Sequence, residues 1–158
     1  MKRTLATTLA TVLMSTAILG AVSAVAPSSA SAAAGDTTLV THHPPLTCTT
    51  TWSFTDRWGH KGTFRCKTRI MEINWFGQGR IEYFGIAPNR TIWHSWASSG
   101  WVVMPNNGLA DEVDGAMARE PHYRTVAVWA GGNLWCSTDY GYGYSWNPWH
   151  RCDLNNYI

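Results

Sequence analysis

The chain has 158 residues, of which 45% are hydrophobic and 13% aromatic, and it carries 12 Lys and Arg against 10 Asp and Glu. Lys2 and Arg3 are two of those 12, so basic and acidic residues balance over residues 33–158. This balance argues against a basic nucleic-acid surface or a polybasic membrane contact, and residues 33–158 contain no apolar segment long enough to span a bilayer.

The N-terminal 32 residues predict a secretory signal peptide. A basic head is followed by an uncharged, mostly small and apolar stretch over residues 4–26, and Ala30-Ser31-Ala32 matches a cleavage motif. We expect cleavage after about Ala32 and secretion.

The rest of the chain divides into an arm and one domain. Residues 33–45 are polar and end in His42-His43-Pro44-Pro45, so we expect a flexible N-terminal arm over residues 33–46. Residues 47–158 are expected to form a single Trp-rich all-β domain, which contains all 10 Trp residues of the chain.

Short alternating segments carry the all-β prediction. Residues 69–76 alternate, with Met71, Ile73 and Trp75 on one face and Glu72 and Asn74 on the other. Further strand candidates, separated by turns rich in Gly, Pro and Asn, are residues 80–86, 91–96, 124–130 and 134–137. Residues 105–121 have a helix-like composition interrupted by Gly115, and we expect a long surface loop there.

The four cysteines predict two disulfides in an exported chain, and three pairings are possible. The segments Cys48–Cys66 and Cys136–Cys152 both contain a Thr-Asp pair, Trp and Gly, and both end in Arg-Cys. Local pairing is therefore favoured. His94 aligns with Cys48 and Cys136 at steps of 46 and 42 residues, which is a period typical of blade-like β repeats. In this alignment His94 replaces a disulfide cysteine, so we expect it to be packed and hydrogen-bonded rather than a general base.

From Ile81 to Trp101 and from Arg124 to Trp149, the chain resembles small Trp-rich β-propeller lectins of the fucose-lectin and tectonin-like kind. The shared unit is a strand, a Gly/Asn turn, a strand carrying Trp, a Gly/Ser turn and a second Trp. In such lectins the ligand sits between neighbouring blades, where an Arg and a Glu bind the sugar hydroxyls and a Trp stacks on the ring. The resemblance implies these roles for Arg124 and for Arg80 with Glu82, although no Glu follows Asn133 as the family pattern requires.

The architecture has two alternatives. Closed propellers usually have four to eight blades, whereas this chain offers about three copies. Either copies from several chains complete a ring as a homo-oligomer, or the domain is a compact β-sandwich or barrel.

Carbohydrate is the first ligand that these residues predict. The candidate ligand-binding aromatic residues are Trp96, Trp101, Trp146, Trp149, Tyr142 and Tyr144. No cofactor, metal site or catalytic residue is expected, because the cysteines are paired and the cluster at Asp111, Glu112 and Asp114 is typical of a solvated surface.

Two other classes of function stay open. An exported inhibitor of an extracellular enzyme, or another protein-binding module, would present the stapled loops 52–61 and 137–149. A small extracellular hydrolase is the third candidate, although no carboxylate pair or nucleophile has a recognisable setting.

Overall fold

The computed structural model describes residues 36–153 except 78, 107, 120–122 and 142–144. Within these residues the chain is all-β, as predicted, with strands and no helix. The strands are β1 (Thr38–His42), β2 (Thr51–Thr55), β3 (Lys61–Arg65), β4 (Ile70–Trp75), β5 (Arg80–Ile86), β6 (Ile92–Ser95), β7 (Val102–Val103), β8 (Glu112–Arg119), β9 (Tyr123–Ala130), β10 (Asn133–Asp139) and β11 (His150–Arg151).

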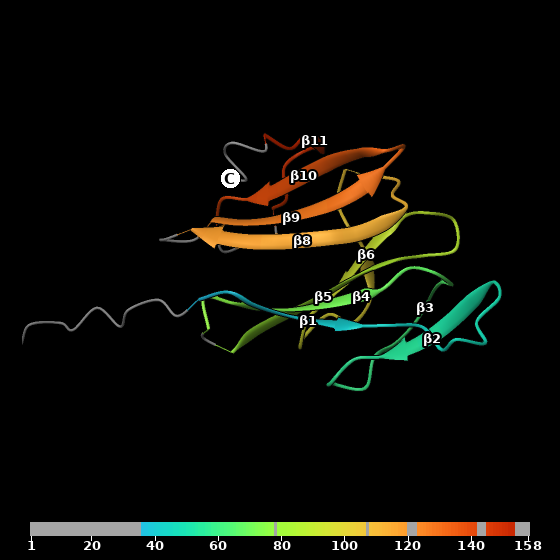
Figure 1. Ribbon diagram of the computed structural model, residues 1–158. Coiled ribbons are helices and arrows are strands. Elements are labelled where there is room, and N and C mark those ends of the chain that lie inside the picture. Colours follow the sequence, from blue (N-terminus) through green and yellow to red (C-terminus); the bar gives the residue numbers. More distant parts are fainter. Residues whose placement is uncertain (1–35, 78, 107, 120–122, 142–144, 154–158) are drawn as a thin grey trace, which may run out of the picture. The chain divides into compact units, whose positions relative to one another are not determined.

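The strands form three layers (Figure 1). The first sheet has the order β1-β4-β5-β6-β7, and the second sheet has the order β11-β10-β9-β8. The third layer is the two-stranded hairpin β2-β3. All paired strands are antiparallel, and β4–β7 and β8–β11 are consecutive meanders.

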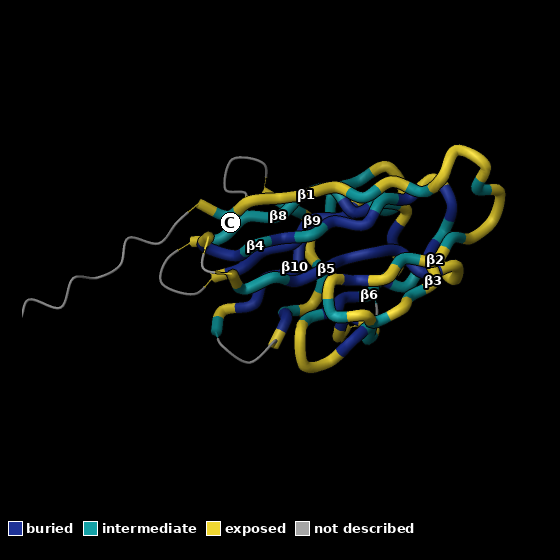
Figure 2. Tube along the Cα trace, turned by 90° about the horizontal axis from the view of Figure 1, so that it is seen from below, coloured by how far each residue is buried: buried dark blue, intermediate teal, exposed yellow. Residues whose placement is uncertain are grey.

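The main core lies between the two sheets. Because side chains alternate along a strand, one face of β4 presents Met71, Ile73 and Trp75 to this core, as the sequence predicted. Val126 and Val128 of β9 belong to the same cluster from the opposite sheet. Figure 2 shows the central strands β4 and β5 largely buried, whereas β1 is largely exposed at the edge.

A second, smaller core lies between the first sheet and the hairpin. Ile70 and Tyr83 point to this side of the sheet and pack with Phe64 of β3. Gly85 permits the close approach, because a Cβ at this position would come within 2.3 Å of the Ile70 side chain and 2.7 Å of Phe64. Burial, reinforced by the hydrogen bond with Glu72, raises the pKa of Tyr83 to about 12.

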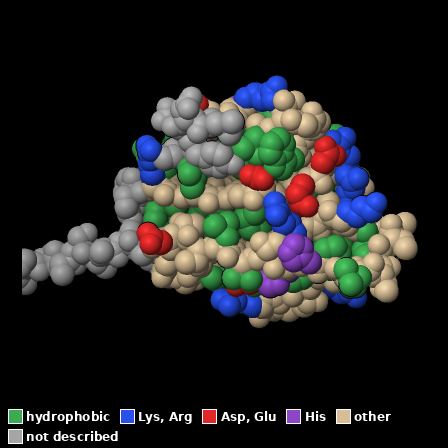
Figure 3. Space-filling model, viewed as in Figure 1, with side chains coloured by type: hydrophobic (Ala, Val, Ile, Leu, Met, Phe, Trp, Pro, Cys, Tyr) green, Lys and Arg blue, Asp and Glu red, His purple; other side chains and the backbone are tan. Residues whose placement is uncertain are grey.

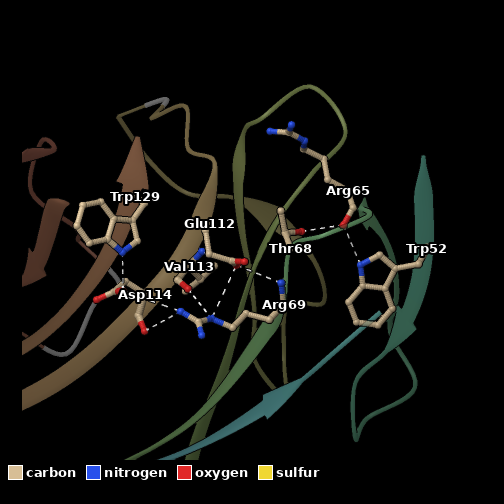
Figure 4. Close-up of polar contacts among 8 residues, drawn as sticks. All are labelled: Trp52, Arg65, Thr68, Arg69, Glu112, Val113, Asp114 and Trp129. Atoms are coloured by element: carbon tan, nitrogen blue, oxygen red, sulfur yellow. Dashed lines mark hydrogen bonds and ion pairs between the residues drawn. The ribbon is translucent and has the colours of Figure 1, made fainter. Parts of the chain in front are cut away.

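Arg69 ties the start of β4 to the second sheet (Figure 4). Its Nε donates to the carbonyl oxygen of Val113 at 2.8 Å, and its backbone N–H donates to the Glu112 carboxylate at 3.1 Å. Nearby, the carbonyl oxygen of Arg65 accepts hydrogen bonds from Trp52 Nε1 at 3.0 Å and Thr68 Oγ1 at 2.8 Å. The linker between β3 and β4 therefore contacts both the hairpin and the second sheet.

Both predicted disulfides are present. Cys48 pairs with Cys66 across the base of the hairpin, and Cys136 of β10 pairs with Cys152 just after β11. Two disulfides are typical of an oxidising, extracellular-type compartment. In the described part of the chain, no helix has the length and apolarity needed to cross a membrane.

The segment expected to be a flexible arm contains strand β1. Thr38–His42 pair with β4 from Asn74 back to Ile70, and His42 Nε2 lies 3.0 Å from the Glu72 carboxylate. The β-branched residues of TLVTH suit a strand, and β4 offers an otherwise unpaired edge.

The surface loop expected within residues 105–121 is corrected over Glu112–Arg119, which form β8. This segment lacks the alternation of a strong strand, but β9 pairs with it along its length. A bulge between Val113 and Gly115 absorbs the irregular pattern.

The repeat and propeller prediction is not confirmed. The three segments form a two-stranded hairpin, a five-stranded sheet and a four-stranded sheet, and no closed ring or barrel appears within the described residues. The coarser expectation of an all-β domain with two disulfides is confirmed.

Loss of either disulfide is expected to destabilise the domain. The bonds close loops with sequence separations of 18 and 16 residues. Replacing Cys48 and Cys66 together by Ser is expected to lower the free energy of unfolding by about 3 kcal/mol, because the unfolded chain regains loop entropy. Urea unfolding followed by Trp fluorescence measures the loss.

The paired replacement of Cys136 and Cys152 is the matched comparison and is expected to have a similar effect. Midpoints equal to that of the unmodified chain in both double variants would contradict the expectation.

Candidate functional site

A small cleft of about 220 Å³ lies between the two sheets and the tip of the hairpin. The first sheet contributes Trp75, Arg80 and Ile81, together with Gly79 of the β4–β5 turn. The segment after β6 contributes Trp96, Ala97 and Ser98. The hairpin contributes Trp58, and β9 contributes Arg124. Three indoles and two guanidinium groups therefore line one cavity.

The β4–β5 turn places Arg80 at this cleft. Phe76, Gly77 and Gly79 all have positive φ, and the backbone N–H of Gly79 donates to Asn74 Oδ1 at 2.9 Å. The left-handed backbone at Gly79 favours glycine, which has no Cβ to crowd the chain. Arg80 then begins β5 opposite Trp75.

A buried polar network closes the inner end of the cleft. Glu82, His94, Arg124 and Asp139 are each at most 3% exposed. Glu82 Oε2 accepts hydrogen bonds from Trp75 Nε1 at 2.9 Å and Arg124 Nη1 at 3.0 Å. Glu82 Oε1 lies 2.7 Å from His94 Nδ1, and Arg124 Nη2 donates to Asp139. Glu82 and Arg124 thus join the two sheets through an ion pair.

Aromatic rings surround the same guanidinium. The Arg124 guanidinium carbon is 5.5 Å from the Trp75 ring centroid and 5.4 Å from that of Trp146. These distances allow cation–π attraction, which is stronger in a desolvated site than in water. Two carboxylates and two indoles therefore hold the Arg124 guanidinium in place.

Asp56 holds the hairpin tip that carries Trp58. Its Oδ1 accepts the backbone N–H groups of Trp58 at 3.0 Å and His60 at 2.9 Å, and its Oδ2 accepts Ser95 Oγ at 2.5 Å. Burial alone would raise the pKa of Asp56, but the hydrogen bonds from Ser95, His60 and Trp58 outweigh it and lower the pKa below its ordinary value. The Trp58 ring packs 5.7 Å from Tyr83.

The cleft brings together three of the predicted ligand-binding residues. Arg80, Trp96 and Arg124 line it, while Glu82 and Trp146 lie directly behind Arg124. Glu82 is saturated by Trp75, His94 and Arg124, so its role here is to hold Arg124 rather than to face the cavity.

Other predicted residues lie elsewhere. Trp101 packs 4.5 Å from the Phe64 ring beneath the hairpin and donates from Nε1 to the His60 carbonyl. Trp149 lines a separate apolar hollow with Ile92 and Trp135. Tyr142 and Tyr144 lie outside the described residues.

His94 is buried and hydrogen-bonded to Glu82, which agrees with the expectation of a packed residue.

Sequence reasoning missed Trp58, Trp75, Asp56 and Asp139. Trp75 was assigned to the core by its alternation, which is correct, but nothing indicated that it also reaches the cleft. Asp139 follows Arg124 by 15 residues on the neighbouring strand. The β9–β10 hairpin turns at Gly131-Gly132, and its register pairs Arg124 with Asp139. Counting residues outward from this turn is the sequence signal that could have found the ion pair.

The surface of the domain carries side chains of all types. On the face in view, basic, acidic and hydrophobic side chains are interspersed (Figure 3). Among the described residues, no group of three or more His, Cys, Asp or Glu is placed to hold a metal ion. The described side chains that line the cleft are mainly indole rings and guanidinium groups.

Comparison with known proteins gives no match to a family model, a curated protein or a solved structure. The resemblance to Trp-rich lectins thus stays a prediction from the residues themselves.

Breaking the buried network is expected to cost much stability. Glu82→Gln removes one of the two carboxylate charges that face the buried Arg124 guanidinium. An amide oxygen accepts weaker hydrogen bonds from Arg124 and Trp75 than a carboxylate does, so we expect a loss of about 1.5–3 kcal/mol in the free energy of unfolding. The control is Arg57→Gln, because Arg57 is 52% exposed in its ion pair with Glu72 and should cost less than about 1 kcal/mol. Equal losses in the two variants would refute the proposed importance of the network.

Asp56 is expected to make the stability depend on acid pH. Because its pKa is lower in the folded than in the unfolded protein, its carboxylate stabilises the fold above the unfolded pKa of about 3.9, and this contribution is lost as the pH falls through the folded pKa. Asp56→Asn is expected to lose about 2 kcal/mol at pH 7 and to show a flatter decline towards pH 2.

Urea unfolding at a series of pH values tests this expectation. Ser95→Ala, which removes a single hydrogen bond to Asp56, should fall between the two proteins. Parallel stability curves for the unmodified chain and Asp56→Asn from pH 7 to pH 2 would show that Asp56 is not the group responsible.

Proposed function

We propose that the chain is a secreted, non-catalytic carbohydrate-binding module whose binding site is the cleft between the two sheets. The observation that carries the proposal is that the indoles of Trp58 and Trp96 line the same cavity as the guanidinium of Arg80. A pyranose has an apolar C–H face that can lie on an indole and a polar rim that pairs with planar donors. Both needs are met within one small space.

The size of the cavity supports a sugar ring. Its volume of about 220 Å³ is smaller than the ~300–1,000 Å³ of sites that enclose drug-sized ligands. One ring fits in such a space, and the remainder of a longer glycan would lie outside it. A cavity of this size therefore suits a module that binds the end of a glycan or a single sugar unit within it.

Rigidity of the site also supports binding. Arg124 is held by Glu82 and Asp139, and Trp96 Nε1 donates to Ser98 Oγ at 3.1 Å. A site whose groups are already ordered loses less conformational entropy when a ligand binds. The buried network therefore contributes to affinity through Arg124 and the Trp75 indole behind it.

The proposal includes the blade-like architecture. β5 and β9 begin at Arg80 and Tyr123, 43 residues apart, and β6 and β10 begin at Ile92 and Asn133, 41 residues apart. These offsets support the inference that the two meanders are successive copies. The cleft lies between them, and the resemblance to lectins that hold their ligand between neighbouring blades supports its choice as the proposed binding site.

Secretion is part of the same proposal. The two disulfides favour an oxidising compartment, and residues 1–32 have the composition of a signal peptide.

An inhibitor or other protein-binding module is the alternative, and it has less support. The aromatic side chains of loop 52–61 pack inward against the first sheet, and Trp146 of loop 137–149 is 4% exposed. Within the described residues of these loops, Trp52, Trp58 and Trp146 thus pack against the domain instead of projecting from it as interface anchors.

A hydrolase also has less support. Glu82 and Asp139 are both engaged by Arg124, and Ser95 Oγ donates to Asp56 instead of to a histidine. None of the described residues that line the cleft is a carboxylate or a histidine.

Trp96→Ala tests the proposed site. The substitution removes an aromatic wall of the cleft, so we expect the affinity for a bound glycan to fall tenfold or more with little loss of stability. A broad glycan array identifies the ligand, and calorimetric titration measures the affinity of each variant.

Trp129→Ala is the matched control, because Trp129 is a partly exposed indole of β9 whose Nε1 donates to Asp114 outside the cleft. It should bind as the unmodified chain does. Absence of binding on the array, or equal binding by both variants, would overturn the proposal.

A further inference from the structure

The hairpin has an open edge along β3. Within the described residues, β3 pairs with β2 and with no other strand. At the tip of the hairpin, the backbone N–H of Asp56 donates to the carbonyl oxygen of His60 at 3.0 Å. Hydrogen-bonded and non-hydrogen-bonded pairs alternate along an antiparallel ladder. Counting from this bond, Lys61 and Thr63 direct their backbone N–H and C=O groups away from β2.

These backbone groups have no other partner in the described part of the chain. The bond at the base of the hairpin, from the Cys66 N–H to the Thr50 carbonyl oxygen at 2.9 Å, follows the same alternation. No described residue outside the hairpin forms a hydrogen bond with the main chain of Lys61 or Thr63. An unpaired strand edge of this kind can accept a further strand.

A groove of about 470 Å³ lies beside this edge. It is lined by three consecutive residues of β3, by two indoles and by the β5–β6 turn: Lys61, Gly62, Thr63, Trp93, Trp101 and residues 87–89. Because side chains alternate between the two faces of a strand, consecutive residues line one groove when the strand presents its edge to it. The free backbone groups of β3 therefore border the groove.

The two indoles form an ordered wall of the groove. Trp101 Nε1 donates to the His60 carbonyl oxygen at 3.1 Å, and the Trp101 ring packs 4.5 Å from that of Phe64. Trp93 Nε1 donates to Thr91 Oγ1 at 2.8 Å. Both rings are partly buried against the smaller core. Their polar atoms are thus already hydrogen-bonded, and an apolar ring surface borders the groove.

Gly62 makes room for a large side chain on an incoming strand. A Cβ at this position would lie 2.5 Å from the Phe64 ring and 3.1 Å from Trp101, so this face of β3 carries no side chain at Gly62. Residues directly opposite each other in an antiparallel pair place their side chains together on one face. The residue opposite Gly62 would therefore place its side chain beside Trp101, where a large apolar group is favoured.

Lys61 adds a preference for charge. Its side chain is exposed and forms no ion pair with a carboxylate of the described residues. Opposite charges that face each other across a strand pair are stabilising. An acidic residue is therefore favoured opposite Lys61, and in an antiparallel strand this residue directly follows the one opposite Gly62.

We propose that the open edge of β3 binds an extended peptide segment of a partner protein by antiparallel strand addition. The segment carries a large apolar residue opposite Gly62, followed by Asp or Glu opposite Lys61. The groove and the cleft at Trp96 have no lining residue in common, so this inference does not depend on the carbohydrate-binding proposal. A second copy of the chain fits less well, because its exposed strand β1 has the sequence TLVTH and no acidic residue.

A short peptide with a methylated backbone tests the inference. The probe is acetyl-Ser-Thr-Thr-Phe-Glu-Thr-Ser-amide, whose Phe and Glu would lie opposite Gly62 and Lys61, with the preceding Thr opposite Thr63. Three further peptides each carry one N-methyl group, on this Thr, on Phe or on Glu. Calorimetric titration into the mature chain, residues 33–158, gives the affinity of each peptide.

We expect the parent peptide to bind with a dissociation constant below about 1 mM. N-methylation of the Thr or of Glu should weaken binding about fivefold or more, because each removes an N–H that faces the β3 edge. N-methylation of Phe should change the affinity by less than about twofold, because its N–H points away from β3. Replacing Phe by Ala, or Glu by Gln, should also weaken binding.

Variants of the chain locate the binding edge. Thr63→Pro removes an N–H that the β2–β3 ladder does not use, so it should abolish peptide binding while the hairpin still forms. Ser53→Pro is the matched control, because Ser53 pairs with Thr63 and its N–H points to the opposite edge of the hairpin. It should bind the peptide normally, and urea unfolding shows whether both variants fold. Lys61→Gln, which leaves the backbone unchanged, should remove most of the preference for Glu over Gln.

Several results would overturn the proposal. These are no binding of the parent peptide, equal affinity of the three N-methyl peptides, and normal binding by folded Thr63→Pro. Self-association of the chain, measured by light scattering and lost in Thr63→Pro, would assign the edge to a second copy instead. Displacement of the peptide by a glycan that still binds Trp96→Ala would assign the groove to a saccharide.

Discussion

The ion pair between Glu82 and Arg124 is the interaction on which the rest of the structure depends. It places a carboxylate from the first sheet against a guanidinium from the second, in an interior where each charge alone would be strongly unfavourable. Asp139, Trp75 and His94 complete the hydrogen bonds of the pair, so both sheets must adopt one relative register for all of them to be satisfied. A purely apolar interface would tolerate small shifts between the sheets, whereas this network does not.

The layers meet through different kinds of contact at their two interfaces. The two sheets share a large apolar core that ends in the charged network. The hairpin packs on the other face of the first sheet through Phe64 and through the hydrogen bond that Asp56 accepts from Ser95 of β6. The cleft lies where these two interfaces meet, since its lining includes Trp58 from the hairpin and Arg124 from the second sheet. The shape of the cleft therefore depends on both interfaces, and a change in either interface would alter the cleft.

The sequence predicts the local structure well where alternation and turns are strong. The strands around Met71–Trp75, Arg80–Ile86 and Arg124–Ala130, and both disulfides, follow from such signals. The sequence does not predict β8, because its residues are weak strand formers and the segment becomes a strand by pairing with β9. The full lining of the cleft is not predicted for a related reason. Trp58, Trp75 and Arg124 are distant in sequence, and only the packing of the layers brings them together.

The burial of Glu82 and Asp139 bears on both the stability of the interior and the chemistry of the cleft. A buried guanidinium whose charge no carboxylate balances would be strongly unfavourable. Placing both acids behind the Arg124 guanidinium balances its charge and keeps the two carboxylates out of the described lining of the cleft. The residues that stabilise Arg124 inside the protein are thus the same ones that hold its guanidinium in place at the cleft.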